Sequence, residues 1–195
     1  MPGSPSVRID EVAAARTAVN HLLHQGHEKI GFIAGVPDDP GFGFASSEQR
    51  RQGYDQALRS AGLPVDPDLT VTGRYGLEGG AAAMAQLLSG PILPTAVFAE
   101  YDELALGALW ALRRAGLQVP ERMSVVGIDD HELAQVLDLT TVAQDAHEQG
   151  AVAAQLLLQS LGPPSDHEPD TDIILPTHLV LRASSAPPRR TRRKR

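Results

Sequence analysis

Two adjacent carboxylates follow a short apolar run in the second half of the chain. The run 123–128, Met-Ser-Val-Val-Gly-Ile, is rich in β-branched residues, and Asp129 and Asp130 come directly after it. This pattern is typical of a buried parallel strand that delivers acidic side chains to its carboxyl end. In an open α/β sheet, ligands bind at the carboxyl ends of the strands. We therefore examined which other residues the chain would bring to that edge.

Polar and aromatic residues follow the other expected strands. In chain order they are Phe44, Ser46, Arg50, Tyr75, Glu100, Tyr101 and Asp102. Carboxylates accept hydrogen bonds from paired hydroxyls, a guanidinium group donates to ring or hydroxyl oxygens, and an aromatic ring stacks on C–H faces. This combination favours a site for a polyhydroxylated small molecule.

A capping role is the alternative for two of the aspartates. Asp102 begins an expected helix, and Asp130 precedes a short expected segment at 131–137. Either side chain could accept the free N–H groups of a helix start. We favour capping over ligand contact for Asp102 and Asp130, and ligand contact for Asp129.

Two further residues have alternatives in packing and pairing. Tyr75 could be a half-buried packing residue as readily as a ligand contact. Arg50 could pair with Glu48 or with another surface acid. The sequence leaves both interpretations open.

No catalytic motif accompanies these residues. The sequence has no Gly-x-Gly-x-x-Gly after a strand, no phosphate-binding loop and no Gly-x-Ser-x-Gly elbow. Its seven histidines form no His-x-x-x-His or His-Glu-x-x-His site. Asp129 and Asp130 beside Asp102 could hold Mg²⁺ for phosphoryl transfer, but a nucleophile and a phosphate cradle are missing. We expect no enzyme, no cofactor and no metal site.

The elements that would position these residues alternate between strands and helices. Strands are expected at 7–9, 29–34, 69–72, 95–99, 123–128, 139–143 and near 173–181, and helices at 11–24, 46–60, 77–88, 102–115 and 145–161. Asp10 should cap the first helix, and Gly26 should end it. Strand–helix–strand units at this spacing predict an α/β fold with a doubly wound parallel sheet. Right-handed crossovers would place all strand carboxyl ends on one edge.

Composition excludes several classes of protein. The 195 residues are enough for one domain or slightly more, and no apolar run approaches the roughly 20 residues that cross a bilayer. The N-terminus shows no secretory signal, and the chain has no cysteine, which fits a cytoplasmic protein without membrane contact. The formal charge is −7 although residues 189–195 are mostly arginine, so the body is too acidic for a nucleic-acid surface.

A series of ordered motifs resembles the lactose/galactose-repressor (LacI/GalR) family of transcriptional regulators. The motifs are Val7–Asp10, Gly26–Ile30, Arg50–Tyr54, Pro94–Ala99, Val119–Glu121, Ser124–Asp130, Leu139–Val142 with Gln144, Leu175–Thr177 and Leu181–Ser184. The resemblance covers residues 7–184. It implies a bacterial regulator whose effector domain is a two-lobed, periplasmic-binding-protein-like (type I) module. Such a domain binds a sugar or nucleoside-like effector in its cleft, and the intact regulator is a homodimer that contacts operator DNA through a helix-turn-helix headpiece.

The resemblance also implies roles for individual residues. Motif matching assigns ligand contact to Arg50, stacking to Tyr75, hydroxyl binding to Asp129, cleft lining to Phe44 and Ser46, and the crossing between lobes to Gln144. Tyr101 stands where the family commonly has asparagine. An asparagine amide offers both a hydrogen-bond donor and an acceptor, whereas the tyrosine offers an aromatic ring and one hydroxyl group. We therefore expect a ligand other than the usual hexose.

The resemblance further implies that only part of the two-lobed module is present. Residues 11–141 correspond to a nearly complete C-terminal lobe, whereas 1–10 and 142–184 supply crossover segments and the last helix and strand of the N-terminal lobe. Residues 185–195 are expected to form a disordered basic tail. We thus expect an effector-sensing region without the DNA-binding headpiece. A secreted solute-binding protein would share the lobes, but it would need a signal peptide.

Overall fold

The structure, a computed structural model, describes residues 5–36, 46–161 and 172–189. Its main feature is a six-stranded sheet in the order β3-β2-β4-β5-β6-β8. The strands are β2 (Ile30–Ala34), β3 (Thr70–Thr72), β4 (Ala96–Ala99), β5 (Ser124–Asp129), β6 (Thr140–Ala143) and β8 (His178–Val180). The first five are parallel, and β8 is antiparallel to β6. The predicted α/β class with a parallel sheet is confirmed.

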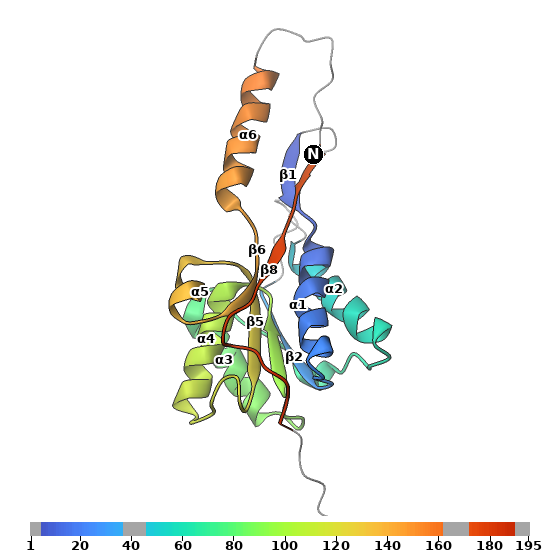
Figure 1. Cartoon of the computed structure of the whole chain (residues 1–195), viewed down its shortest axis with the longest axis vertical. Coiled ribbons are helices and arrows are strands. Elements are labelled where there is room, and N and C mark those ends of the chain that lie inside the picture. The colour runs from blue at the N-terminus through green and yellow to red at the C-terminus, as the bar shows by residue number, and fades with distance from the viewer. Residues whose placement is uncertain (1–4, 37–45, 162–171, 190–195) are drawn as a thin grey trace, which may run out of the picture.

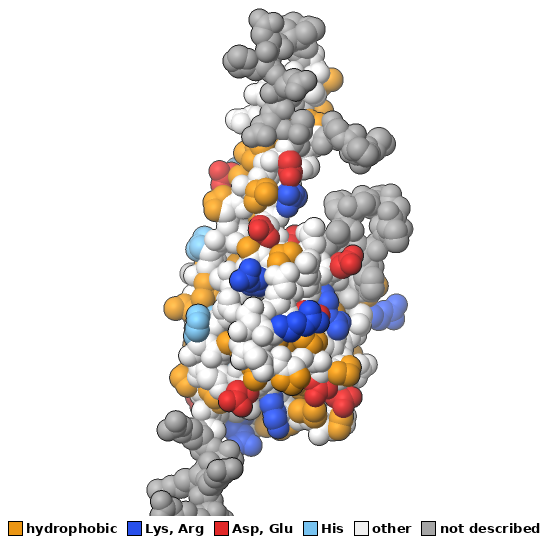
Figure 2. All heavy atoms as spheres, turned by 90° about the vertical axis from the view of Figure 1, so that its right-hand side faces the viewer, with side chains coloured by type: hydrophobic (Ala, Val, Ile, Leu, Met, Phe, Trp, Pro, Cys, Tyr) orange, Lys and Arg blue, Asp and Glu red, His pale blue; other side chains and the backbone are white. Residues whose placement is uncertain are grey.

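Helices cover both faces of this sheet (Figure 1). Helices α1 (Glu11–His24) and α2 (Ser46–Ser60) pack on one face, and α3 (Gly76–Ser89) and α4 (Asp102–Arg114) on the other. Stacked rings of Phe32, Tyr54 and Phe98 fill the first interface. Figure 2 shows acidic and basic side chains interspersed over the α1–α2 side, rather than one patch of a single sign.

The strand order has a switch point between β2 and β4, and the region outside the carboxyl ends of the strands there is called the crevice below. From β2 the chain passes through α2 to β3 on one side, and it then returns through α3 to β4 on the other side. Such a reversal is a topological switch point, and open α/β sheets bind ligands outside the strand carboxyl ends at this place.

A smaller unit lies beyond the carboxyl edge of the sheet (Figure 1). Strand β1 (Ser6–Ile9) pairs in parallel with β7 (Asp172–Leu175), and α6 (Ala146–Ser160) packs against β1. Only Leu156 of α6 is buried, and its neighbours Leu157 and Leu158 are 60% and 70% exposed. The two strands of this unit cannot cover α6 on all sides.

The chain near 173–181 departs from prediction. A single strand was expected there, but the structure has β7 and β8 in different sheets, separated by Pro176 and Thr177. Proline has no N–H to donate to a ladder, and the chain crosses between the two units at this point.

The expected division at residue 141 also differs from the arrangement of the sheets. Strand β6 continues to Ala143, β8 returns to the six-stranded sheet, and Ser184 bonds the backbones of Val125 and Thr140. Residues 178–186 therefore pack with the larger unit, and α6, β1 and β7 form the smaller one.

Helix α1 begins and ends where the sequence predicts. Asp10 accepts a hydrogen bond from the backbone N–H of Ala13 at 2.9 Å, and Gly26 has a φ of 95°. Both the predicted cap and the predicted terminating glycine are confirmed. In the part of the chain that the structure describes, no helix is long and apolar enough to cross a bilayer.

The helices α3 and α4 approach each other through two glycines. A Cβ atom on Gly107 of α4 would overlap the backbone carbonyl of Leu77 in α3, and one on Gly80 of α3 would overlap the backbone of Leu104 in α4. The backbones are thus in direct contact, which orients α4 and its N-terminus at the crevice.

We predict that Gly107→Ala destabilises the fold. The added methyl group must push α3 and α4 apart, and overpacking of this kind costs about 1–3 kcal/mol. Urea titration followed by circular dichroism measures the change. Gly150→Ala on α6 is the matched control, because its Cβ would meet no atom within 4 Å. It should leave stability unchanged or raise it by up to about 1 kcal/mol. Equal effects of the two variants would contradict the close approach.

Candidate functional site

Arg50 lies at the centre of the crevice. It projects from α2 and is only 6% exposed. Its Nε donates to Glu11 Oε2 at 2.6 Å, its Nη1 donates to the carbonyl oxygen of Glu100 at 2.7 Å, and its Nη2 lies 3.5 Å from Asp129 Oδ1. Burial lowers the pKa of Arg50, but the charges of Asp129 and Glu11 outweigh burial, so the pKa lies above its ordinary value. Its acidic partners are therefore the partly buried Glu11 and Asp129, and not Glu48.

Asp129 lies at the end of β5, beside Arg50. Its Oδ1 also accepts a hydrogen bond of 2.6 Å from the Gln144 amide nitrogen. Burial raises the pKa of Asp129, and the Arg50 charge and the Gln144 hydrogen bond offset only part of that rise. The side chain is still 32% exposed, so it faces the crevice. A carboxylate with this exposure can accept hydrogen bonds from a ligand.

The backbone at this strand end is strained. Asp129 has a φ of 126° and Asp130 a φ of 56°, a region that L-residues other than glycine rarely adopt. Such strain persists only where the surroundings fix it, and it concentrates at functional sites. The observation supports a functional role for this strand end.

The capping role predicted for Asp130 is wrong. The N-cap of α5 (Glu132–Val136) is His131, whose Nδ1 accepts the N–H of Leu133 at 3.1 Å. The carboxylate of Asp130 instead accepts a hydrogen bond of 2.7 Å from Arg182. Asp129 and Asp130 therefore turn to different partners. Within the described ranges, no group of three or more histidines and acids could hold a metal ion.

The capping role predicted for Asp102 is wrong as well. Tyr101 occupies the N-cap position of α4, and Asp102 is fully buried behind it. Asp102 accepts hydrogen bonds from the Thr141 hydroxyl at 2.6 Å and from the His131 N–H at 2.9 Å. A Cβ on Gly127 would overlap Asp102 Oδ1, so the glycine of β5 makes room for this carboxylate. Its role in this structure is to position the ends of β5, β6 and α5.

Two tyrosines form an aromatic surface at the mouth of the crevice. The rings of Tyr75 and Tyr101 are 5.9 Å apart and inclined by 23°. Tyr75 is 66% exposed, which does not fit the half-buried packing alternative. The hydroxyl oxygen of Tyr101 is buried and has no hydrogen-bond partner among the described residues, and burial raises its pKa. An exposed ring on a rigid second ring can stack on a ligand face.

The remaining predicted residues lie at the start of α2 and at the crossing. Ser46 is the first residue of α2, and Phe44 lies outside the described residues. Gln144 follows β6 directly, where the chain passes to the smaller unit. The structure thus brings Arg50, Asp129 and Gln144 into contact, with the tyrosine pair beside them.

Sequence reasoning missed two partners of this group. Glu11 bonds Arg50, and the Gln149 amide nitrogen donates to Gln144 Oε1 at 2.8 Å. Nothing in the local pattern marks either residue, because an acid in the first turn of a helix is common and a glutamine on a helix surface is ordinary. Glu100, noted but not ranked as a site residue, accepts the Gly35 N–H at 2.6 Å and the Ser47 hydroxyl at 3.0 Å.

Comparison with known proteins extends this description. Residues 19–185 match the family described as periplasmic binding protein-like domain. The chain is 43% identical over 183 residues to the HTH-type transcriptional repressor CytR of Escherichia coli K12, which covers 93% of this chain and 52% of that protein. The chain therefore spans about half the length of this relative.

Two solved structures are similar in fold. The transcriptional regulator CelR–cellobiose complex superposes with a TM-score of 0.84 at 34% identity, over 93% of this chain and 54% of that one. A LacI family regulator from Enterococcus faecium with bound ribose gives 0.83 at 30% identity, over 96% and 67%. Both superpositions include nearly all of this chain.

We predict that Asp102 makes stability depend on pH. Burial raises its pKa from an ordinary value of 3.8 to about 7, against the hydrogen bonds from Thr141 and His131. The folded state thus binds this proton more tightly than the unfolded state. The stabilisation is complete below about pH 4 and is lost as the pH rises through 7.

Asp102→Asn should remove this dependence while keeping the shape of the side chain. The unfolding free energy of the wild type should fall relative to the variant by at most about 1.4 kcal/mol per pH unit between pH 4 and 7. Urea titrations at several pH values measure this difference. Glu132→Gln, an exposed acid on α5, is the control. Parallel curves for the wild type and Asp102→Asn would refute the assignment.

Proposed function

The chain belongs to the periplasmic-binding-protein-like domain family of LacI-type transcriptional regulators, and we propose that it is the effector-sensing region of such a regulator. The observation that carries the proposal is the convergence of Arg50, Asp129 and the Tyr75–Tyr101 pair at one switch-point crevice. The relatives are regulators rather than enzymes, and we propose no catalytic role for this chain.

The crevice favours a small neutral ligand with hydroxyl groups. Asp129 supplies an exposed acceptor, and Tyr75 supplies a flat apolar face. Arg50 is buried, so its main contribution is to hold Asp129 in place and ionised near the ligand. A sugar or nucleoside-like metabolite has this combination of hydroxyls and an apolar face. Cellobiose and ribose, which are bound in the two similar structures, have hydroxyl groups of this kind.

The two structural units suggest how binding would be transmitted. We propose that the six-stranded unit is one lobe of the effector domain and that β1, β7 and α6 belong to the other. Three chain crossings, at Asp10, Gln144 and Pro176, join them next to the site. A ligand held between lobes would change their relative orientation by hinge motion at such crossings. In this proposal a separate headpiece of the regulator binds operator DNA. The regulator works in the cytoplasm.

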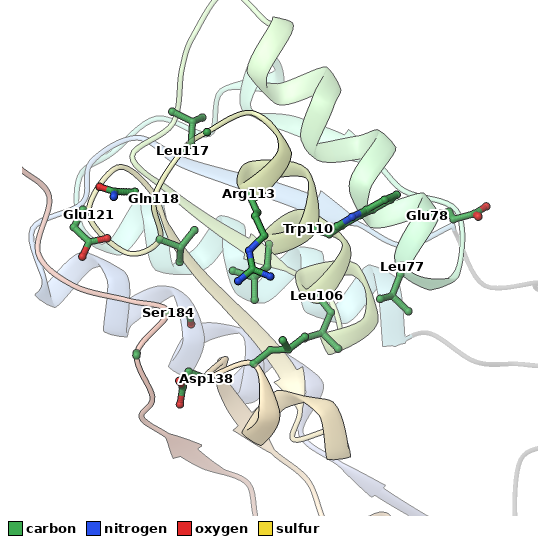
Figure 3. A pocket seen from close by; sticks show the side chains of 15 residues that line it. Leu77, Glu78, Leu106, Trp110, Arg113, Leu117, Gln118, Glu121, Asp138 and Ser184 are labelled. Atoms are coloured by element: carbon green, nitrogen blue, oxygen red, sulfur yellow. The ribbon is translucent and has the colours of Figure 1, made fainter.

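The proposed regulator is a homodimer, and the α4 face is the candidate contact. A depression of about 1020 Å³ is lined by apolar side chains that include Leu77, Leu106 and Leu137 (Figure 3). Trp110 lies there and is 46% exposed. The charged side chains that border it carry both signs, namely Glu78, Arg113, Glu121 and Asp138. A patch with both signs of charge around an apolar centre suits contact with a second copy about a two-fold axis.

We predict that ligand binding depends on the Tyr75 ring and the Asp129 charge. Differential scanning fluorimetry against cellobiose, ribose, other sugars and common nucleosides should identify a ligand that raises the melting temperature. Tyr75→Ala should weaken binding of that ligand about threefold to tenfold, since an aromatic contact contributes about 0.5–1.5 kcal/mol. Asp129→Asn should weaken it about tenfold or more, since the hydrogen bonds to a charged acceptor are lost.

Tyr75→Phe is the matched control, because it keeps the ring and removes only the hydroxyl. It should bind like the wild type if stacking is the contribution of residue 75. Isothermal titration of the four proteins gives the affinities. A ligand whose affinity does not change in Tyr75→Ala and Asp129→Asn would place the binding site elsewhere.

We predict that Trp110→Glu disrupts self-association. A carboxylate at the centre of an apolar contact loses hydration without gaining a partner. Light scattering coupled to size exclusion should show a dimer for the wild type and a monomer for the variant at the same concentration. Leu158→Glu on α6 is the control, because Leu158 is equally apolar and 70% exposed on another surface. Dissociation by Leu158→Glu alone would assign the contact to α6.

A further inference from the structure

A chain of two amide hydrogen bonds connects the crevice to the smaller unit. The Gln144 amide nitrogen donates to Asp129 Oδ1 at 2.6 Å, and the Gln149 amide nitrogen donates to Gln144 Oε1 at 2.8 Å. Asp129 belongs to the six-stranded sheet, Gln144 lies in a crossing, and Gln149 is part of α6. Both glutamines are half-buried. The two bonds therefore span the junction between the units.

The direction of these bonds is fixed by chemistry. An ionised carboxylate can only accept, so Gln144 must turn its nitrogen toward Asp129. Its oxygen then faces away from Asp129 and needs a donor, which Gln149 supplies. An acceptor at residue 149 would favour the flipped Gln144 amide, with its nitrogen toward residue 149. The Gln144 oxygen would then face the oxygens of Asp129 and be repelled by them. Asp129 therefore sets which end of Gln144 it meets, and a donor at residue 149 reinforces that orientation whereas an acceptor would oppose it.

The place of Gln149 is itself well defined. Asp145 is the N-cap of α6 and accepts the Glu148 N–H at 2.8 Å, while the Gln149 N–H bonds the Asp145 carbonyl oxygen at 2.9 Å. The first turn of α6 is therefore held rigidly against the crossing. A change in the orientation of α6 would move the Gln149 amide away from Gln144.

We propose that Gln149 is a positioning residue for the binding site: it reinforces the orientation in which the Gln144 amide donates to Asp129, and so links the hydrogen bonding of Asp129 to the placement of α6. The inference rests on the proposed function in so far as Asp129 is the ligand acceptor. A ligand hydroxyl at Asp129 and a displacement of α6 would then affect the same hydrogen bonds, which couples binding to the arrangement of the two units.

Several charged groups surround Asp129 and must be considered in any test. They are Glu11 on α1, Arg50 on α2, Glu100 after β4, Asp102 on α4, and the adjacent Asp130, which pairs with Arg182. None of these groups changes when residue 149 is substituted. A shift in the titration of Asp129 caused by a neutral substitution at residue 149 would therefore pass through Gln144.

The experiment is nuclear magnetic resonance of the unliganded chain with three variants, Gln149→Met, Gln149→Glu and Gln155→Glu. The readouts are the exchange rate of the Gln144 side-chain amide protons and the titration midpoint of the Asp129 carboxyl carbon. Gln149→Met should speed exchange by up to about fivefold, because the Gln144 amide loses the bond that holds its orientation and its N–H groups stay bonded to Asp129 for less of the time. It should also raise the Asp129 midpoint, because a less constrained amide stabilises the ionised form less well.

The charged variants separate polarity from simple electrostatics. Gln149→Glu should raise the Asp129 midpoint more than Gln149→Met does, whereas Gln155→Glu, on the exposed surface of the same helix, should leave it near the wild-type value. In a Gln144→Met background, Gln149→Met should have no further effect on the Asp129 titration midpoint, because the Gln144 amide that connects the two residues is absent. Melting temperatures should fall by no more than about 2–4 °C per lost hydrogen bond, which would show that the fold of each variant is intact.

Two results would overturn the proposal. The first is an Asp129 midpoint and a Gln144 exchange rate that do not change in Gln149→Met. The second is an equal shift from Gln149→Met in the wild-type and Gln144→Met backgrounds, which would exclude the path through Gln144. No ligand is used, so either result is distinct from a failure to find an effector, which the ligand panel detects.

Discussion

The burial of one guanidinium group constrains the whole carboxyl edge of the sheet. Arg50 can stay charged inside the protein only because Glu11, the Glu100 carbonyl and Asp129 surround it, and these come from α1, the end of β4 and the end of β5. Removing one partner from a buried ion pair costs about 3–5 kcal/mol, since the other charge is left uncompensated. The ends of four separate elements are therefore held together at the switch point. The same contacts leave Asp129 facing the crevice, so the interaction that stabilises this edge also prepares the acceptor.

Around that cluster, buried polar groups fix the rest of the site. Asp102 ties the start of α4 to β6 and to the start of α5, and Gly127 gives it the space to do so. The backbone at Asp129 and Asp130 is held at positive φ, with one carboxylate paired to Arg50 and Gln144 and the other to Arg182. Strain of this kind persists because its surroundings are rigid. Tyr75, which stacks on the half-buried Tyr101, is the exposed part of the arrangement, and this fits a role in contacting ligand rather than in stability.

The junction between the two units connects the candidate site to α6. Three crossings join the two units, and at one of them the Gln144–Gln149 pair links the Asp129 carboxylate to the first turn of α6. The smaller unit exposes much of α6, so its position depends on a few contacts at this junction. In a sensor built from such parts, the ligand-binding carboxylate and the orientation of α6 share one set of hydrogen bonds. That sharing is a physical basis for coupling that requires no long path through the core.

The sequence by itself determined the fold class, most element boundaries and the edge at which the site lies, because alternating periodicities and helix caps are local signals. Strand-end positions and family motifs also predicted Arg50, Tyr75, Asp129 and Gln144 as candidate site residues. Only the tertiary structure decided their partners. Asp102 and Asp130 look like caps in sequence, but one is buried against β6 and the other pairs with Arg182. Glu11 and Gln149 carry no local mark, and they become part of the site because folding brings the start of α1 and the first turn of α6 to the same crevice. Hydrogen bonds between residues 39 or 79 positions apart depend on how the chain packs, and a local pattern cannot encode that.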